Sequence, residues 1–196
     1  MVARSKTIAP AKAGAADDVE PLAILMDRYI DGDARAFEEL YRQVAPRLLG
    51  YLIRLTRDRA RAEDLLQVTF TKVHRARSSY LRGAPPVPWL LAIARRCFYD
   101  ERRSARHRPE ELSFDGAVPE PKPEPAAPAT DVAEALEQAL RSLPESYREA
   151  IELTKVTGLS IAEAADVVGA SEMAVKLRVH RGYKLLRETL RRFSRS

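Results

Sequence analysis

Residues 160–186 read SIAEAADVVGASEMAVKLRVHRGYKLL, and this stretch decides how the C-terminal part of the chain folds. Ser160 followed three residues later by Glu163 is a capping box, in which each residue bonds to the other's backbone at a helix start. Gly169 is placed where a tight turn needs a positive φ, and Ser171 can cap a second helix. The spacing predicts two helices joined by a short turn, which is the helix-turn-helix pattern of DNA-binding proteins.

The second helix of this motif is expected over 171–193 and has two different faces at about 100° per residue. Its apolar face contains Val175, Val179, Gly182, Leu186 and Phe193. Its outward face mixes small apolar groups with cations, which suits a major groove, since apolar groups touch thymine methyls and cations meet base acceptors or phosphates. The candidate DNA-contacting residues are Ser171, Glu172, Ala174, Lys176, Leu177, Arg178, His180, Arg181 and Lys184.

These candidates divide by their position along the helix. The N-terminal part of a recognition helix reaches base edges, and its later residues meet the backbone. The residues expected to set sequence preference are Glu172, Ala174, Lys176 and Leu177, and those expected mainly to add affinity are Arg178, Arg181 and Lys184.

The charges of the chain are gathered into blocks. Six arginines and two acids lie between residues 95 and 108, and eight Lys or Arg and two acids lie between 171 and 196. Seven acids and one Lys lie between them, at 109–134. Two basic segments, in a chain of net charge +5, fit a polyanionic partner such as nucleic acid.

A proline-rich segment divides the chain into two units. Residues 109–130 read PEELSFDGAVPEPKPEPAAPAT, with six prolines and few large apolar groups. Such a segment cannot bury enough surface to offset its ordering entropy, so we expect an extended, flexible, acidic linker. The expected organisation is a disordered N-terminal arm at 1–19, a helical unit at 20–108, this linker, and a helix-turn-helix unit at 131–196.

Apolar periodicity predicts helices rather than strands in both units, so the expected fold is all-α. In the first unit the expected helices span about 20–31, 33–44, 46–57, 60–77 and 86–106. In the second they span about 131–142, 144–157, 160–168 and 171–193. Asp33 and Asp58 are expected N-caps, and Pro46 is expected to break the helical pattern.

The first unit contains AEDLLQVTFTKVHRA (62–76) followed by WLLAIARRCFYDERRSARHR (89–108). These motifs resemble conserved region two of extracytoplasmic-function (ECF) sigma factors, where AEDLxQxxF precedes WLxxIAxNxxxDxxR. Residues 136–188 resemble region four of the same family. The resemblance implies a region 2 helical bundle and a region 4 helix-turn-helix domain, in a non-enzymatic subunit that directs core RNA polymerase to promoter DNA and opens its strands. The C-terminal helix would then read the minus-thirty-five element.

On the 60–77 helix, one exposed stripe looks like a docking surface. It consists of Asp64, Gln67, Val68 and Thr71, opposite the expected buried face. In the family this helix binds the clamp coiled coil of the largest polymerase subunit, and Asp64 and Gln67 match the DLxQ positions. The resemblance also implies a contact with the polymerase flap. It further implies regulation by an anti-sigma factor, commonly membrane-bound, which no residue here identifies.

The 86–106 helix is expected to bury Leu90, Leu91, Ala94, Cys97 and Phe98 and to present cations with an aromatic group on its other face. Such a face can hold phosphates while a base stacks. In the family this helix and the preceding loop capture the opened minus-ten strand. The candidate residues are Arg95, Tyr99, Arg102, Arg103 and Arg106 on the helix, with Tyr80 and Arg82 as accessible loop residues.

Some positions depart from the family pattern. Arg96 stands where the family usually has Asn, and we expect it to pair with Asp100 at i, i+4. Leu177 replaces a common Ser and Tyr183 a common Arg, which affects promoter sequence rather than protein class.

Two other function classes fit the sequence less well. An autonomous helix-turn-helix regulator would need a dimer surface to span two half-sites, and the sequence offers no zipper to supply one. An enzyme that acts on nucleic acid is disfavoured because the adjacent Asp100 and Glu101 point about 100° apart on a helix, so their carboxylates cannot bind one metal ion together. The three His and Cys97 also lack zinc spacing. We expect no cofactor, metal or small-molecule substrate, and a cytoplasmic protein.

Overall fold

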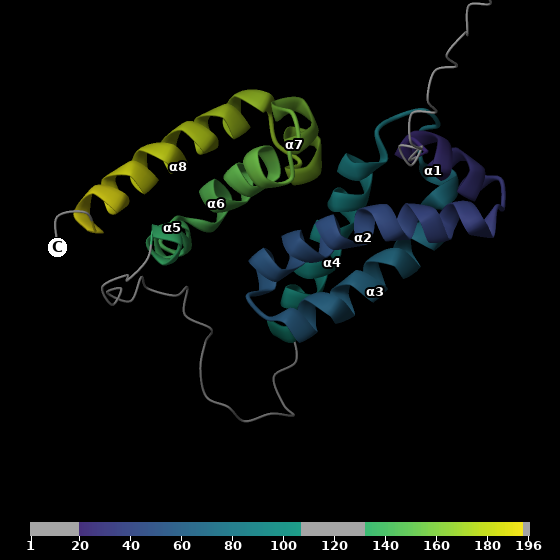
Figure 1. Cartoon of the computed structure of the whole chain (residues 1–196), viewed down its shortest axis with the longest axis horizontal. Coiled ribbons are helices and arrows are strands. Elements are labelled where there is room, and N and C mark those ends of the chain that lie inside the picture. The colour runs from purple at the N-terminus through teal and green to yellow at the C-terminus, as the bar shows by residue number, and fades with distance from the viewer. Residues whose placement is uncertain (1–19, 107–131, 194–196) are drawn as a thin grey trace, which may run out of the picture.

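The computed structural model describes residues 20–106 and 132–193, which form two groups of helices (Figure 1). The first group contains α1 (Leu22–Ile30), α2 (Ala34–Thr56), α3 (Arg59–Ala76), the 3-10 turn η1 (Arg77–Ser79) and α4 (Pro86–Arg106). The second contains α5 (Val132–Arg141), α6 (Glu145–Ile151), the π-helical turn η2 (Glu152–Val156), α7 (Ile161–Val168) and α8 (Glu172–Phe193). The all-α prediction is confirmed over these ranges. The predicted arm at 1–19 and linker at 109–130 lie outside the described residues.

Helices α1–α4 pack around one apolar core. Asp33 caps α2 by accepting hydrogen bonds from the amides of Arg35 and Ala36, and Asp58 caps α3 by accepting one from Arg61. Both predicted caps are therefore confirmed. The largest fully buried side chains of this core are Leu25, Met26, Leu40, Val44, Leu48, Tyr51, Leu52, Val73, Leu90 and Leu91.

The predicted break at Pro46 is wrong, because α2 runs through it as one helix. Proline removes one backbone hydrogen bond and crowds the preceding turn, at a cost of about 3 kcal/mol. Val44 before it and Leu48, Tyr51 and Leu52 after it share one buried face. Each such side chain gains roughly 1.5–3 kcal/mol on burial, so tertiary packing outweighs the local penalty.

The helix-turn-helix forms as the sequence predicts. The Ser160 and Glu163 capping box is present with both hydrogen bonds. Gly169 ends α7 in the left-handed region at φ 66°, and the Ser171 hydroxyl accepts from the Ala174 amide at the start of α8. Val175 is completely buried and anchors α8 on the core.

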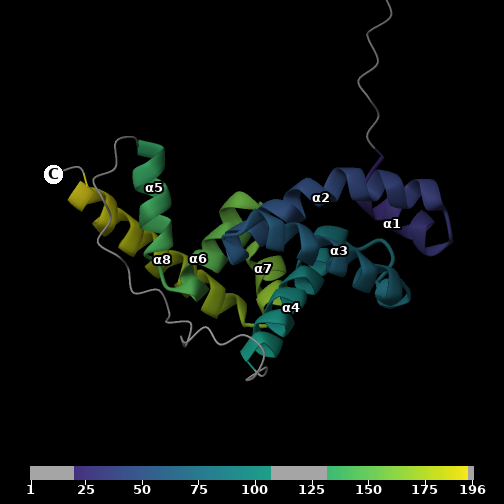
Figure 2. The same cartoon turned by 90° about the horizontal axis from the view of Figure 1, so that it is seen from below.

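The two groups of helices pack against each other. Helix α7 lies beside α4, and this arrangement is visible in Figure 2. One continuous apolar cluster includes Leu48 and Leu52 from α2 together with Leu153, Ala164 and Val175 from the second group. Within the described parts of the chain, no helix is both long and apolar enough to cross a membrane.

Candidate polymerase and nucleic-acid interfaces

The predicted polymerase-binding stripe is an exposed face of α3. Asp64, Gln67 and Thr71 are exposed, and Val68 keeps 46% of its surface accessible. The Thr71 hydroxyl donates to the Gln67 carbonyl oxygen at 3.0 Å, so its polar group is partly engaged within the helix. The opposite face of α3 was predicted to be buried, and it buries Ala62, Leu65, Leu66, Thr69, Phe70 and Val73. Ala76, which belongs to the same predicted face, is half-buried.

Sequence reasoning overlooked Tyr41 on α2. Its ring packs against Phe70 of α3 with centroids 4.6 Å apart, yet Tyr41 remains exposed. The exposed Tyr41 ring therefore adds an apolar element beside α3, the helix that carries the predicted polymerase-binding stripe. Tyr41 lies four residues after Phe37, a spacing that places both rings on one side of α2.

The cationic face of α4 was predicted to be open to solvent, but the structure shows it in contact with α6. Arg95, Tyr99 and Arg102 follow one another along the helix and all meet carboxylates of α6. Arg95 Nε donates to Glu149 at 2.8 Å, and the Tyr99 hydroxyl donates to Glu145 at 2.9 Å. Arg102 Nη1 reaches both carboxylate oxygens of Glu145 at 3.0 Å. We call Arg95, Tyr99 and Arg102 the α4 cationic face.

The electrostatics of this contact follow from its partial burial. Burial raises the pKa of Tyr99, and the nearby Glu149 and Glu145 raise it further, so its hydroxyl stays protonated and donates. Burial alone would raise the pKa of Glu145, but hydrogen bonds from Arg102 and Tyr99 outweigh it and lower that pKa. Glu145 is therefore held as a charged acceptor.

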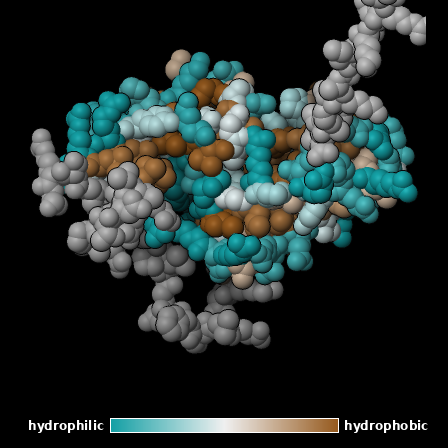
Figure 3. Space-filling view, in the orientation of Figure 1, coloured by the Kyte–Doolittle hydropathy of each residue, from teal (hydrophilic) through white to brown (hydrophobic). Residues whose placement is uncertain are grey.

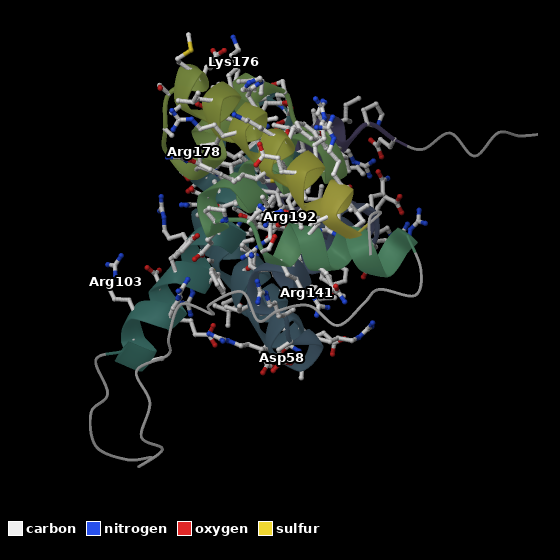
Figure 4. All side chains as sticks on the ribbon, turned by 90° about the vertical axis from the view of Figure 1, so that its left-hand side faces the viewer. Asp58, Arg103, Arg141, Lys176, Arg178 and Arg192 are labelled. Atoms are coloured by element: carbon white, nitrogen blue, oxygen red, sulfur yellow. The ribbon has the colours of Figure 1, made fainter. Side chains whose placement is uncertain are left out.

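The other predicted minus-ten residues differ in accessibility. Arg103 is exposed and points outward from α4 (Figure 4). Arg106 ends α4, but its side chain lies outside what the structure describes. Arg82 is exposed and pairs with Asp31 of the α1–α2 turn.

The prediction that Tyr80 is accessible is wrong. Its side chain is buried, with 6% exposure, and its hydroxyl donates to the Ala84 carbonyl. The ring packs edge-on against Trp89 with centroids 5.4 Å apart. The loop thus uses Tyr80 to close over the start of α4, and it leaves Leu81 as its exposed apolar residue.

The predicted ion pair between Arg96 and Asp100 does not form. The Asp100 carboxylate accepts from Lys72 Nζ at 3.1 Å, so it links α4 to α3. Arg96 is exposed. A cross-helix partner displaced the local pair because α3 brings Lys72 to the same side of α4.

The recognition helix α8 presents most of its predicted DNA residues to solvent. The exposed ones are Ser171, Glu172, Lys176, Leu177, His180, Arg181 and Lys184. Arg178 is half-buried, which agrees with its place toward the core edge of the helical wheel. Ala174 is half-buried as well, although the wheel places it on the outward face. Figure 4 shows Lys176 at the outer end of the helix and Arg178 on its side. Of the predicted apolar face, the side chain of Phe193 lies outside the described residues.

Further along α8, apolar side chains line a shallow groove. The groove has a volume of about 460 Å³ and is lined by Leu136 of α5 and by Tyr183, Leu186, Leu190, Arg187 and Arg191 of α8. Apolar surface on this part of the molecule is visible in Figure 3.

Comparison with known proteins identifies the family. The sigma-70 region 2 family matches residues 40–108, and the sigma-70 region 4 family matches residues 133–186. The chain is 40% identical over 165 residues to RNA polymerase sigma factor CarQ of Myxococcus xanthus, covering 84% of this chain and 95% of CarQ. It is 36% identical over 175 residues to ECF RNA polymerase sigma factor SigF of Caulobacter vibrioides, covering 87% and 94% of the two chains. The chain belongs to the ECF sigma factors.

Two solved structures share this fold. The sigma factor RpoE, solved in complex with the anti-sigma factor NepR from Bartonella quintana, superposes with a TM-score of 0.63 at 28% identity, covering 81% of this chain and 98% of RpoE. CnrH, solved in complex with the cytosolic domain of CnrY, gives 0.64 at 25% identity, covering 88% and 97%. As an ECF sigma factor, this protein is a non-enzymatic initiation factor that binds core RNA polymerase and promoter DNA.

Proposed function

We propose that three helices divide the tasks of this sigma factor. The exposed stripe of α3 binds the polymerase clamp, the α4 cationic face with Arg103 holds the opened minus-ten strand, and the start of α8 reads the minus-thirty-five duplex. The observation that carries this proposal is α8, which is anchored by the buried Val175 while Lys176 and Leu177 beside it are exposed. A helix held in this way presents one face to a major groove.

The polymerase contact is tested by replacing Asp64 and Gln67 together with Ala. Both side chains are exposed, so the double variant keeps its helicity, and its affinity for core polymerase falls because the docking face loses its polar contacts. Glu188→Ala, an exposed carboxylate on α8, is the control and binds core polymerase as the wild type does. Undiminished core binding by the double variant contradicts the assignment of α3.

The reading of the minus-thirty-five element is tested with Lys176 and Lys184. Lys176→Ala is expected to cost about 1–3 kcal/mol on the matched promoter and much less on a scrambled one, because base contacts carry discrimination. Lys184→Ala is expected to weaken binding to the matched and scrambled promoters equally, because a phosphate contact carries no sequence discrimination. The slope of log affinity against log salt concentration is expected to fall by about one. The measurement is a binding titration at several salt concentrations. An equal loss on both sequences for Lys176→Ala refutes the division.

The cellular setting belongs to the same proposal. We expect the protein to act in the cytoplasm, where core polymerase and promoter DNA are found, with an anti-sigma factor as a regulatory partner. The support for that partner is that RpoE, which has the same fold, was solved in complex with the anti-sigma factor NepR. Specific transcription that requires added core polymerase would separate this role from that of an autonomous regulator.

A further inference from the structure

The contact between α6 and α4 contains a buried carboxylate with specific hydrogen-bond donors, and is therefore more than a surface ion pair. Glu149 is only 4% exposed, and its carboxylate accepts hydrogen bonds from Tyr51 of α2 at 2.7 Å and from Arg95 of α4 at 2.8 Å. Both donors belong to the first group of helices. A buried carboxylate needs such partners, because an unpaired buried charge is strongly destabilising. Tyr51 and Arg95 can therefore donate to Glu149 only when the two groups are docked.

The α6 carboxylates, Glu145 and Glu149, occupy the α4 cationic face in the way a phosphate would. The guanidinium of Arg102 uses one nitrogen to reach both oxygens of Glu145, and that of Arg95 uses Nε and Nη2 on Glu149 at 2.8 and 3.3 Å. Arginine holds carboxylates and phosphates with the same donor geometry. The two carboxylates therefore occupy guanidinium donors that could otherwise bind a nucleic-acid backbone.

The aromatic group on this face is engaged as well. The guanidinium carbon of Arg95 lies 4.5 Å from the centre of the Tyr99 ring, so it covers one side of that ring. The Tyr99 hydroxyl is bonded to Glu145 at the same time. A nucleotide base cannot stack on the covered side, and a phosphate at this position would have to replace the hydrogen bonds that Tyr99 and Arg102 donate to Glu145.

We propose that the C-terminal helical group is an intramolecular competitor of single-stranded DNA, and that Glu145 and Glu149 mask the α4 cationic face until the two groups separate. This inference rests on the proposed function, which assigns that face to the opened minus-ten strand. In the docked form of the free protein the face is occupied by α6. In the separated form it is available to the strand.

Other contacts stabilise the docked form without using that face. Arg47 of α2 donates to the Thr157 carbonyl, and the shared apolar cluster runs between the groups. The carboxylates can therefore be changed individually while the folded cores remain. Substitution of Glu145 is expected to disturb the packing less, since its side chain is 37% exposed, whereas Glu149 is buried.

The test uses full-length protein and a fluorescently labelled single-stranded oligodeoxynucleotide of mixed sequence, with anisotropy as the binding signal. If the docked form is about nine-tenths of the free protein, releasing it raises the apparent affinity about tenfold. The E145Q/E149Q variant is expected to show that gain. E145Q alone is expected to show a smaller gain of the same sign. The control E38Q/E188Q removes two exposed carboxylates elsewhere and is expected to change affinity much less.

Two further measurements separate the outcomes. Small-angle scattering is expected to give a larger radius of gyration for E145Q/E149Q, and circular dichroism checks that its helices persist. Wild-type affinity in both E145Q and E145Q/E149Q, or an equal gain in the control, overturns the masking. In that case the variant Arg103→Gln, on the exposed part of α4, tests whether only the masking proposal fails or the assignment of α4 to DNA binding fails as well. If it weakens binding, the α4 assignment stands without masking; if it does not, that part of the proposed function fails too.

Discussion

Glu152 gives a prediction whose size can be worked out from its surroundings. It is the first residue of η2 and only 4% exposed. Arg148 Nε lies 4.0 Å from its Oε1, and within the described residues its Oε2 accepts no hydrogen bond. Burial raises the pKa of Glu152 to about 7, and Glu149 adds to this, while Arg148, Arg54 and Arg57 oppose it. The carboxyl group is therefore half-protonated near neutral pH.

The sign of the pH dependence follows from this raised pKa. The folded protein holds the Glu152 proton more tightly than the unfolded chain, whose pKa is 4.5. The contribution of Glu152 to folding stability therefore falls as pH rises from about 4.5 to about 7, and it is constant above that range. At about 1.4 kcal/mol for each pKa unit, the full cost at pH 8 is about 3 kcal/mol.

Glu152→Gln removes this cost because the amide is neutral at every pH. We expect the variant to be more stable than the wild type by about 3 kcal/mol at pH 8 and by only about 1 kcal/mol at pH 5. The assay is urea unfolding followed by circular dichroism at both pH values. Glu188→Gln, which is exposed, is the control and should follow the wild type. A variant that is less stable at pH 8 would show that Glu152 is ionised and stabilised by its arginine neighbours, which refutes the reasoning.

Three further predictions concern stability and are checked by thermal unfolding. Val175→Ala is expected to cost about 2–3 kcal/mol, from two lost methyl groups and the cavity they leave, whereas the exposed Met173→Ala is expected to cost little. A Val175→Ala variant as stable as Met173→Ala would show that α8 is not anchored there. Gly169→Ala is expected to cost about 1 kcal/mol, since it forces φ 66° on a residue with a Cβ. Gly50→Ala, inside α2 with only the flexible Arg54 nearby, is expected to raise folding stability by about 0.5–1 kcal/mol. Stability changes of the same sign for the two glycine substitutions would contradict this reasoning. Asp33→Ala is expected to cost about 1 kcal/mol through loss of the α2 cap, and an unchanged melting temperature would contradict it.

The sequence by itself determined the features that depend on neighbours within about one helical turn. The Ser160 and Glu163 capping box, the left-handed Gly169 and the caps at Asp33 and Asp58 all formed as predicted. Each is decided by backbone hydrogen bonds and φ preferences that a few consecutive residues control. The buried and exposed faces of α3 followed from the helical period for the same reason.

Tertiary structure decided whatever depends on segments distant in sequence. Packing on both sides of Pro46 kept α2 continuous, and Lys72 of α3 took Asp100 from its expected partner Arg96. Trp89 and the Ala84 carbonyl buried Tyr80. Docking of α6 covered the α4 cationic face, which the helical period alone predicts to be open. Periodicity shows which side chains share a face, but what covers that face depends on contacts across the fold, and here those contacts come from about fifty residues further along the chain.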